Sequence, residues 1–162
     1  MSAAAGPDEA VIETMLEAAR AQARAGLAEG GVPIGAALFA GGELLGAGRN
    51  LRVQQGSPIH HGETSALAAA GRLPAATYAR STMVTTLSPC DMCTGAILLY
   101  KIPRVIIGEN TTFVGAEQLL RSRGVDLVIL DDAECRELMA ASIEARPDVW
   151  FEDIGEPPAH PA

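Results

Sequence analysis

The sequence lacks several features that define whole classes of protein. Only three of its 162 residues are cysteine, and no apolar run approaches the length of about 20 residues that a transmembrane helix requires. The longest helical stretches are interrupted by Arg20, Arg24, Arg72 and Lys101. The amino terminus has no basic residue followed by a leucine-rich segment, so it does not resemble a secretory signal. We therefore expect no membrane span and a cytoplasmic location.

Basic residues are also scarce. The chain has 12 Lys and Arg against 20 Asp and Glu, which gives a formal net charge of −8. Nucleic-acid binding depends on Lys and Arg to neutralise phosphates, and no cluster of these residues occurs along the sequence. We therefore expect no nucleic-acid partner.

Length and hydrophobicity together limit the domain organisation. A chain of 162 residues with 48% hydrophobic content can bury one substantial core. It is too short for two ordinary domains. We predict a single domain over residues 1–156 and a loose, proline-rich tail over residues 157–162.

Hydrophobic spacing changes between helix-like and strand-like periods along the chain. Apolar residues three and four apart predict a first helix, which Asp8 can cap, and Gly41-Gly42 predicts a hairpin turn. Because helices join the later strands, those strands should be parallel. The predicted fold class is α/β, a three-layer α/β/α sandwich with a central five-stranded mixed sheet. The expected strands are 33–39, 43–49, 81–87, 104–108 and 125–130, and the expected helices are 8–29, 61–73, 90–100, 115–123 and 132–145.

Two short strings, HGE at residues 61–63 and PCDMC at residues 89–93, contain the ligands of a zinc site. His61, Cys90 and Cys93 supply one imidazole and two thiolates, which fill three positions of a tetrahedral ion. The fourth position is left for water, and an open position distinguishes a catalytic zinc site from a structural one. Both strings precede predicted helices, whose free N–H groups favour thiolate.

Glu63 stands beside the imidazole ligand and is the predicted catalytic residue. Zinc lowers the pKa of a bound water toward about 7, and a nearby carboxyl group can accept that proton and pass it to a substrate. His-x-Glu followed later by Pro-Cys-x-x-Cys is the signature of zinc-dependent base deaminases. We expect Zn²⁺ as the cofactor and Glu63 as the proton shuttle.

Other interpretations of the cysteine pair stay open at the level of sequence. A redox Cys-x-x-Cys of thioredoxin type needs no His-Gly-Glu, and a structural zinc site needs a fourth ligand. The remaining Cys and His residues are His60, Cys135 and His160. We expect His60 to be a surface or packing residue, Cys135 a buried core thiol and His160 incidental. The alternative outside the enzyme class is a noncatalytic, zinc-stabilised interaction module.

Longer strings resemble one family. The run TLSPCDMCTGAI at residues 86–97, with EGGVPIG at 29–35, GEN at 108–110 and WFEDIGE at 150–156, is similar to the fungal-type cytosine deaminases of the cytidine deaminase-like superfamily. The likeness extends from the first predicted helix to residue 156. It implies hydrolysis of the free base cytosine to uracil and ammonia, a step of pyrimidine salvage, by a cytosolic, homodimeric zinc enzyme.

The resemblance also implies roles for individual residues. It assigns the zinc to His61, Cys90 and Cys93 and the proton shuttle to Glu63. A C-terminal lid within residues 1–156 would close over the base. The substrate would be bound at its amide edge by Asn50 and the Gly62 N–H, at its amino group by Asp153, on its faces by Phe113, Trp150 and Ile154, and elsewhere by the main chain of Ser88 and Cys90.

The preferred substrate has alternatives. Guanine, another aminopyrimidine or a triazine would suit the same chemistry, and tRNA adenosine deaminases share the zinc signature. Arg49, directly before Asn50, could favour another heterocycle if its charge turned toward the base. Because neighbouring side chains on a strand point to opposite faces, we expect Arg49 to face solvent instead.

Overall fold

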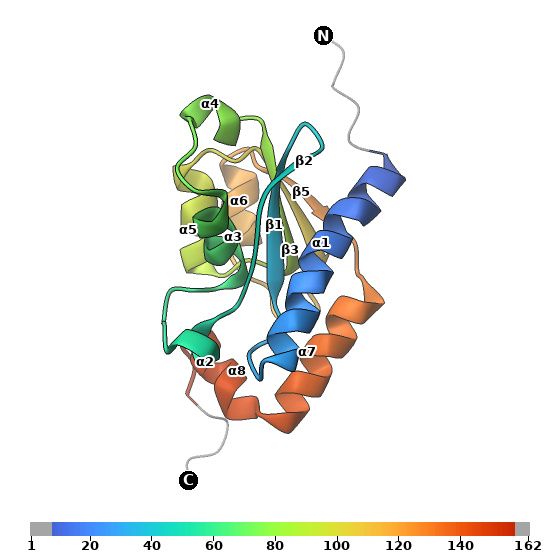
Figure 1. Cartoon of the computed structure of the whole chain (residues 1–162), viewed down its shortest axis with the longest axis vertical. Helices are drawn as coiled ribbons and strands as arrows, with labels where there is room; N and C mark the ends of the chain where they lie inside the picture. The colour runs from blue at the N-terminus through green and yellow to red at the C-terminus, as the bar shows by residue number, and fades with distance from the viewer. Residues whose placement is uncertain (1–7, 158–162) are drawn as a thin grey trace.

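The computed structural model describes residues 8–157, and Figure 1 shows a sheet with helices on both sides. No helix within this range is long and apolar enough to span a bilayer. His160 and all of the predicted tail except Pro157 lie outside the described residues. The elements are α1 (Glu9–Ala28), β1 (Gly35–Ala40), β2 (Glu43–Arg49), α2 (Arg52–Gln55), α3 (Gly62–Ala70), α4 (Ala75–Tyr78), β3 (Ser81–Leu87), α5 (Asp91–Leu99), β4 (Arg104–Glu109), α6 (Glu117–Ser122), β5 (Asp126–Ile129), α7 (Ala133–Ala145) and α8 (Pro147–Asp153).

The five strands form one mixed sheet in the order β2-β1-β3-β4-β5. β1 is antiparallel to both β2 and β3, whereas β3, β4 and β5 are parallel. Gly41 and Gly42 both have positive φ, 56° and 82°, which the tight hairpin between β1 and β2 requires. The predicted five-stranded mixed sheet with parallel later strands is confirmed.

Side-chain alternation on the strands produces two separate cores, one on each face of the sheet. In Figure 1, α3, α5 and α6 lie on one side of the sheet and α1 and α7 on the other. Leu38 and Met83 pack with residues of α3, α5 and α6 on one face, whereas Phe39 and Val84 pack with α1 and α7 on the other. Neighbouring strand residues point to opposite faces, so an uninterrupted apolar strand supplies both cores. The three-layer α/β/α arrangement is confirmed. Cys135 lies in the α1–α7 core at 2% exposure, as expected of a buried thiol.

The ends of the long helices follow local sequence signals, and one of them differs clearly from its predicted position. The Asp8 side chain accepts a hydrogen bond from the Val11 N–H at 2.9 Å and begins α1, as predicted. The helix expected over residues 61–73 was too long, because α3 ends at Ala70 before Gly71 with φ 77°. A glycine with positive φ is a common helix stop.

Three short helices were missed in the sequence analysis: α2, α4 and α8. Two have only four residues, too few for a hydrophobic period to show. α8 begins at Pro147, which ends α7 as predicted but also starts the next helix, because proline suits the first helical position. α8 packs Trp150 against Val32, Ile34 and Leu87 in a third cluster at the end of the sheet.

Close contact between β2 and α3 leads to a prediction about stability. A Cβ on Gly48 would lie 2.4 Å from the Ala66 nitrogen and 2.5 Å from the Ser65 carbonyl carbon, and neither backbone atom can move alone. Gly48→Ala should therefore destabilise the protein by about 1–3 kcal/mol, as overpacking does.

Gly95→Ala is the matched control, because Gly95 lies within α5 and a Cβ at this position would have no other atom within 4 Å. Alanine is favoured over glycine in a helix by about 1 kcal/mol, so this variant should be neutral or more stable. Urea denaturation of both variants measures the difference. A Gly48→Ala midpoint equal to that of the unaltered protein would contradict the close approach of β2 and α3.

Candidate metal centre and substrate pocket

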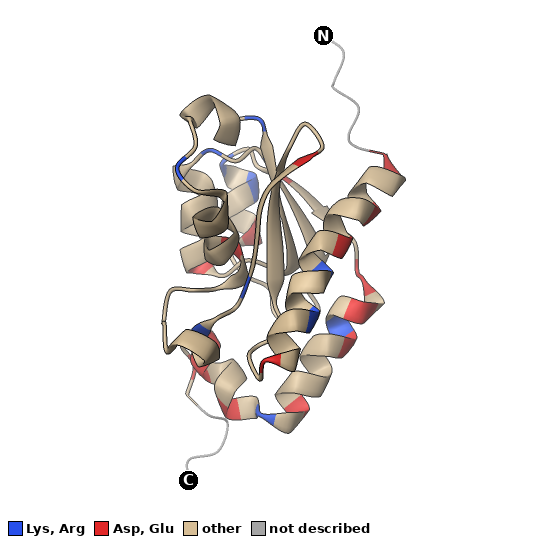
Figure 2. Cartoon of the chain, viewed as in Figure 1, with Lys and Arg blue, Asp and Glu red and all other residues tan. Residues whose placement is uncertain are grey.

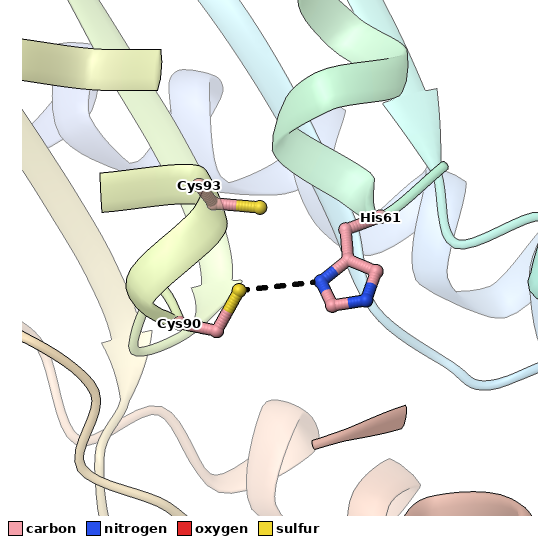
Figure 3. Close-up of side chains that lie close together, drawn as sticks. All are labelled: His61, Cys90 and Cys93. Atoms are coloured by element: carbon pink, nitrogen blue, oxygen red, sulfur yellow. Dashed lines mark hydrogen bonds between the residues drawn. The ribbon is translucent and has the colours of Figure 1, made fainter. Parts of the chain in front are cut away.

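The three predicted zinc ligands converge from two helix starts. His61 is the N-cap of α3, Cys90 is the N-cap of α5, and Cys93 lies in the first turn of α5. Their ligand atoms all lie within 4.8 Å of one another, and Figure 3 shows the imidazole facing both sulfurs. The His61 Nδ1 atom is 3.4 Å from the Cys90 Sγ atom. These distances are short enough for one ion to contact all three.

The pKa values of the two thiols are shifted in opposite directions. A hydrogen bond from Cys93 lowers the pKa of Cys90 to about 4; burial opposes the shift, and His61 adds to it. The pKa of Cys93 is raised, because this thiol donates its proton to Cys90 and is itself buried. Both cysteines are free of disulfides. Without a metal the pair therefore shares one proton, and a divalent cation would displace it.

The donor set fits zinc. One imidazole nitrogen and two sulfurs are preferred zinc ligands, and three protein ligands leave a position for water. The second imidazole nitrogen, Nε2, lies 3.5 Å from the Asp153 Oδ1 atom, and carboxylates commonly orient metal-bound histidines in this way. Burial lowers the pKa of His61, but Cys90 and the charge of Asp153 raise it overall.

A closed structural site would need a fourth ligand, and neither of the candidates in the described range supplies it. Within residues 8–157 the group of potential ligands consists of His61, Cys90 and Cys93 alone. Cys135 lies in the α1–α7 core, and His60 is not part of the group. This arrangement favours the open type of zinc site.

Glu63 is buried in the second position of α3, next to this group. Its Oε1 atom accepts a hydrogen bond of 2.6 Å from the Thr85 hydroxyl group on β3. Burial raises the pKa of Glu63, whereas the Thr85 hydrogen bond lowers it. A carboxyl group whose pKa is raised toward neutrality can both accept and donate protons. The position and environment of Glu63 therefore suit acid–base chemistry.

An inner pocket adjoins Glu63 and the ligands. Of the predicted substrate residues, six line it: Ser88, Cys90, Phe113, Trp150, Asp153 and Ile154. The Phe113 and Trp150 rings meet edge to face, with centroids 5.9 Å apart and an angle of 81° between the ring planes. The cavity measures about 20 Å³, little more than one water molecule needs. The pocket is thus tightly closed by α8.

The two other predicted substrate residues do not line this pocket. The Asn50 side chain is fully buried; its amide nitrogen donates to the Asp153 Oδ1 atom at 2.6 Å, and its oxygen accepts from the Arg52 N–H. Gly62 is buried against Ile34 at the start of α3. Their contacts with a base stay predictions.

Arg49 points away from the site, as the strand alternation predicted. Its guanidinium group binds the Glu29 carboxylate at 2.6 Å and the Gln22 side chain at 2.8 Å on the α1 side of β2. Its charge is therefore neutralised by Glu29 and does not reach the pocket.

A wider cleft leads from the inner pocket to the surface. It measures about 550 Å³, and among the described residues that line it Asp91, Glu152, Asp153 and Glu156 are acidic whereas only Arg52 is basic. Figure 2 shows further acidic positions along α8 and α7. Phosphate groups would be repelled at this mouth.

Several site residues were not found by sequence reasoning. Ile34 and Leu87 line the inner pocket, and Thr85 holds Glu63. A signal was present for Thr85, because it is a polar residue on the face of β3 that also carries Met83. Ile34 and Leu87 look like ordinary core residues in the sequence, and only their positions at the end of the sheet reveal the pocket.

The geometry agrees with a known family. Residues 9–109 match the family model described as the cytidine and deoxycytidylate deaminase zinc-binding region. The chain belongs to this family of zinc-binding deaminases. The match includes all three zinc ligands and Glu63, whereas Phe113, Trp150 and Asp153 lie beyond it.

The chain is similar to proteins whose names give different substrates. The cytosine deaminase of Candida albicans is 53% identical over 142 residues, which cover 87% of this chain and 95% of the fungal protein. A tRNA-specific adenosine deaminase of Streptococcus pyogenes is 35% identical over 64% of this chain and 67% of its own. The guanine deaminase of Nitrosomonas europaea superposes with a TM-score of 0.64 at 25% identity, over 85% of this chain and 86% of that one.

Proton release should accompany zinc binding, because Cys93 must lose the proton that its raised pKa retains. We expect the zinc affinity to fall as the pH is lowered and at least one proton to be released for each zinc bound: one from Cys93 and a further fraction from His61, whose pKa is also raised. Calorimetric titration of the metal-free protein in two buffers of different ionisation enthalpy measures this number.

Cys93→Ala should abolish both tight zinc binding and this proton release. Cys135→Ala is the matched control, since Cys135 is also a buried thiol but lies in the α1–α7 core. It should bind zinc with the same proton release as the unaltered protein. A zinc affinity independent of pH, or zinc loss in Cys135→Ala, would contradict the assignment of the ligands.

Proposed function

We propose that this protein hydrolyses cytosine to uracil and ammonia in the cytoplasm, as a step of pyrimidine salvage. The observation that carries the proposal is the 53% identity to the Candida albicans cytosine deaminase over 95% of that protein. The local geometry supports the same chemistry, because Glu63 is buried beside a group of one imidazole and two sulfurs. Residues 1–156 would form one zinc deaminase domain with α8 as its lid.

The chemistry depends on proton transfer by Glu63. A zinc ion held by His61, Cys90 and Cys93 would supply a water molecule whose pKa is lowered toward about 7. Glu63 would take the proton from this water as the oxygen attacks C4 of the base, and would deliver it to ring N3. Glu63 would then take the remaining proton from the hydroxyl group now bonded to C4 and pass it to the amino nitrogen. The C4–N bond would break as the C4 carbonyl forms, and ammonia would leave. The Thr85 hydroxyl group, which donates to the Glu63 Oε1 atom, would keep the carboxyl group aimed at the pocket during both transfers.

Asp153 and Asn50 would orient the base. Asp153 is buried, and burial raises its pKa while His61, Asn50 and Arg52 lower it. In the closed pocket the Asn50 amide donates to the Asp153 carboxylate. When a base enters, Asp153 would turn to accept its amino group, and Asn50 with the Gly62 N–H would bind the amide edge. The hydrogen bond between Asn50 and Asp153 thus satisfies both buried groups until substrate arrives.

α8 would act as a lid. Trp150, Asp153 and Ile154 come from α8 and its end, and they close a cavity of about 20 Å³ that is too small for a base. A flat ring could enter only if this helix moved away from Phe113. Such opening commonly limits product release in enzymes with lids.

Guanine is the second candidate substrate, because the Nitrosomonas europaea guanine deaminase has the same fold at 25% identity. Two observations favour a one-ring base. The identity to the cytosine deaminase is twice as high, and the tight inner pocket would have to expand more for a purine. Adenosine in tRNA is disfavoured by the acidic cleft around Glu152 and Glu156.

Replacement of Glu63 tests the mechanism. Glu63→Gln keeps the size of the side chain but cannot carry a proton, so turnover of cytosine should fall on the order of 10² to 10⁴ fold. The zinc content should be unchanged. Ammonia release from cytosine, guanine and a triazine by the unaltered protein identifies the substrate in the same assay. Near-normal turnover by Glu63→Gln would rule out the proton shuttle, and ammonia from guanine alone would rule out cytosine.

We further propose that the protein is a homodimer. The exposed apolar side chains of Met92 and Val114, at 37% and 61% exposure, line the cleft. Ile59, at 58% exposure, directly follows Pro58, which also lines it. Apolar side chains grouped on one face are typical of protein interfaces. Sedimentation equilibrium should give twice the chain mass, and Val114→Glu should give the single chain mass. A monomer at micromolar concentration in the unaltered protein would contradict the dimer.

A further inference from the structure

A buried polar network lies behind the pocket wall. Glu117 begins α6 and is 8% exposed. Its Oε1 atom accepts hydrogen bonds from the Ser88 hydroxyl group at 2.7 Å and from the Asn110 amide at 3.2 Å. Glu117 does not line the inner pocket or the wider cleft. Its carboxyl group therefore contacts other parts of the protein and has no direct route to a substrate.

Ser88 links this carboxyl group to the segment that carries Phe113. The Ser88 hydroxyl donates to Glu117 and at the same time accepts from the Gly115 N–H at 2.9 Å. The Ala116 N–H donates to the Pro89 carbonyl at 3.2 Å. A Cβ on Gly115 would lie 1.8 Å from the Pro89 oxygen, so no side chain fits between the two segments. The segment is thus fixed to the turn that leads into the zinc ligands.

The opposite end of the same segment is also fixed. The Glu109 Oε2 atom accepts from the Thr111 and Thr112 N–H groups at 2.8 and 2.9 Å. Between the two anchored ends stands Phe113, whose ring contacts Trp150 edge to face. The location of Phe113, and with it one wall of the pocket, therefore depends on Ser88, which lines the pocket, and on Glu109 and Glu117, which do not.

Stability alone does not account for a carboxyl group at position 117. Burial of a carboxylate is costly unless hydrogen bonds compensate, and a buried polar group often contributes little net stability compared with an apolar one. One turn further along α6, Leu120 already packs into the main core at 0% exposure. The partners of Glu117, in contrast, are Ser88, which lines the inner pocket, and Asn110, which lies three residues before Phe113.

We propose that Glu117 is a positioning residue that sets the width of the substrate pocket. Through Ser88 and Asn110 it holds Phe113 against Trp150, so that the pocket admits a one-ring base and discriminates against additional bulk. The substrate class in this proposal rests on the proposed deamination of cytosine. The positioning of Phe113 by Glu117 does not rest on that function, because it can be measured without enzyme turnover.

The single tryptophan of the chain provides that measurement. Trp150 is the only tryptophan, so all indole fluorescence reports on the contact with Phe113. Glu117→Ala removes the acceptor of Ser88 and Asn110 and should release the segment. We expect a red shift of the Trp150 emission and stronger quenching by acrylamide, with zinc content unchanged. Glu117→Gln keeps one acceptor oxygen for Ser88 and should restore most of the original emission.

Enzyme kinetics supply the second readout. In Glu117→Ala, kcat/KM for cytosine should fall on the order of 10²-fold, the effect of a misplacement of about 1 Å. The ratio of kcat/KM for 5-methylcytosine to that for cytosine should rise on the order of tenfold, the scale on which one methyl group is discriminated. Gln118→Ala is the matched control, because Gln118 is the exposed neighbour of Glu117 on α6. It should behave like the unaltered protein in every readout.

Leu120→Ala separates positioning from general destabilisation. It should lower the unfolding midpoint by loss of core packing but leave the Trp150 emission and the substrate ratio unchanged. If Glu117→Ala behaves like Leu120→Ala, with a lower midpoint and unaltered emission and ratio, the proposal is overturned. If cytosine is not a substrate of the unaltered protein, the proposed function fails, and the Trp150 emission alone then confirms or overturns the positioning role.

Discussion

The convergence of two helix starts on one point is the constraint on which the rest of the site depends. His61, Glu63 and Asp153 are each no more than 8% exposed, and Cys90 and Cys93 lie beside them. Ionisable groups buried so close together are unfavourable without compensation. Compensation comes from the free N–H groups of α3 and α5, from the proton shared between the thiols and, when bound, from a zinc ion. The sheet places both helix starts at the same end, which makes the site possible.

Around this centre the pocket is assembled from distant parts of the chain. β1 and β3 contribute Ile34 and Leu87 at or next to their ends, the segment before α6 contributes Phe113, and α8 contributes Trp150. Hydrogen bonds outside the pocket hold these walls: Thr85 orients Glu63, and Glu117 anchors the segment with Phe113. Binding pockets at the carboxyl ends of strands are general in α/β sheets. Here α8 and the segment before α6 close the pocket over the end of the sheet.

The sequence was sufficient for most of the regular structure. In long helices and buried strands the apolar residues recur at a regular spacing. α1, α5, α7 and all five strands could therefore be predicted to within a few residues. α2 and α4 have four residues each, too few for a hydrophobic period to show. α8 was hidden because Pro147 signals both the end of one helix and the start of another. The anchoring roles of Thr85 and Glu117 were missed for a different reason, since each depends on a partner that is 22 or 29 residues away.

By itself the sequence determined the ligand types, their spacing and the layers of the fold, because these depend on side-chain chemistry and on periods that repeat within a few residues. Only the tertiary structure decided that Asn50 binds Asp153 across 103 residues of chain, that Arg49 turns to Glu29, and that Ser88 meets Glu117. Such pairs form when separate elements reach the same place with their side chains directed toward each other. No local sequence pattern predicts these contacts, because they result from how all the layers pack together.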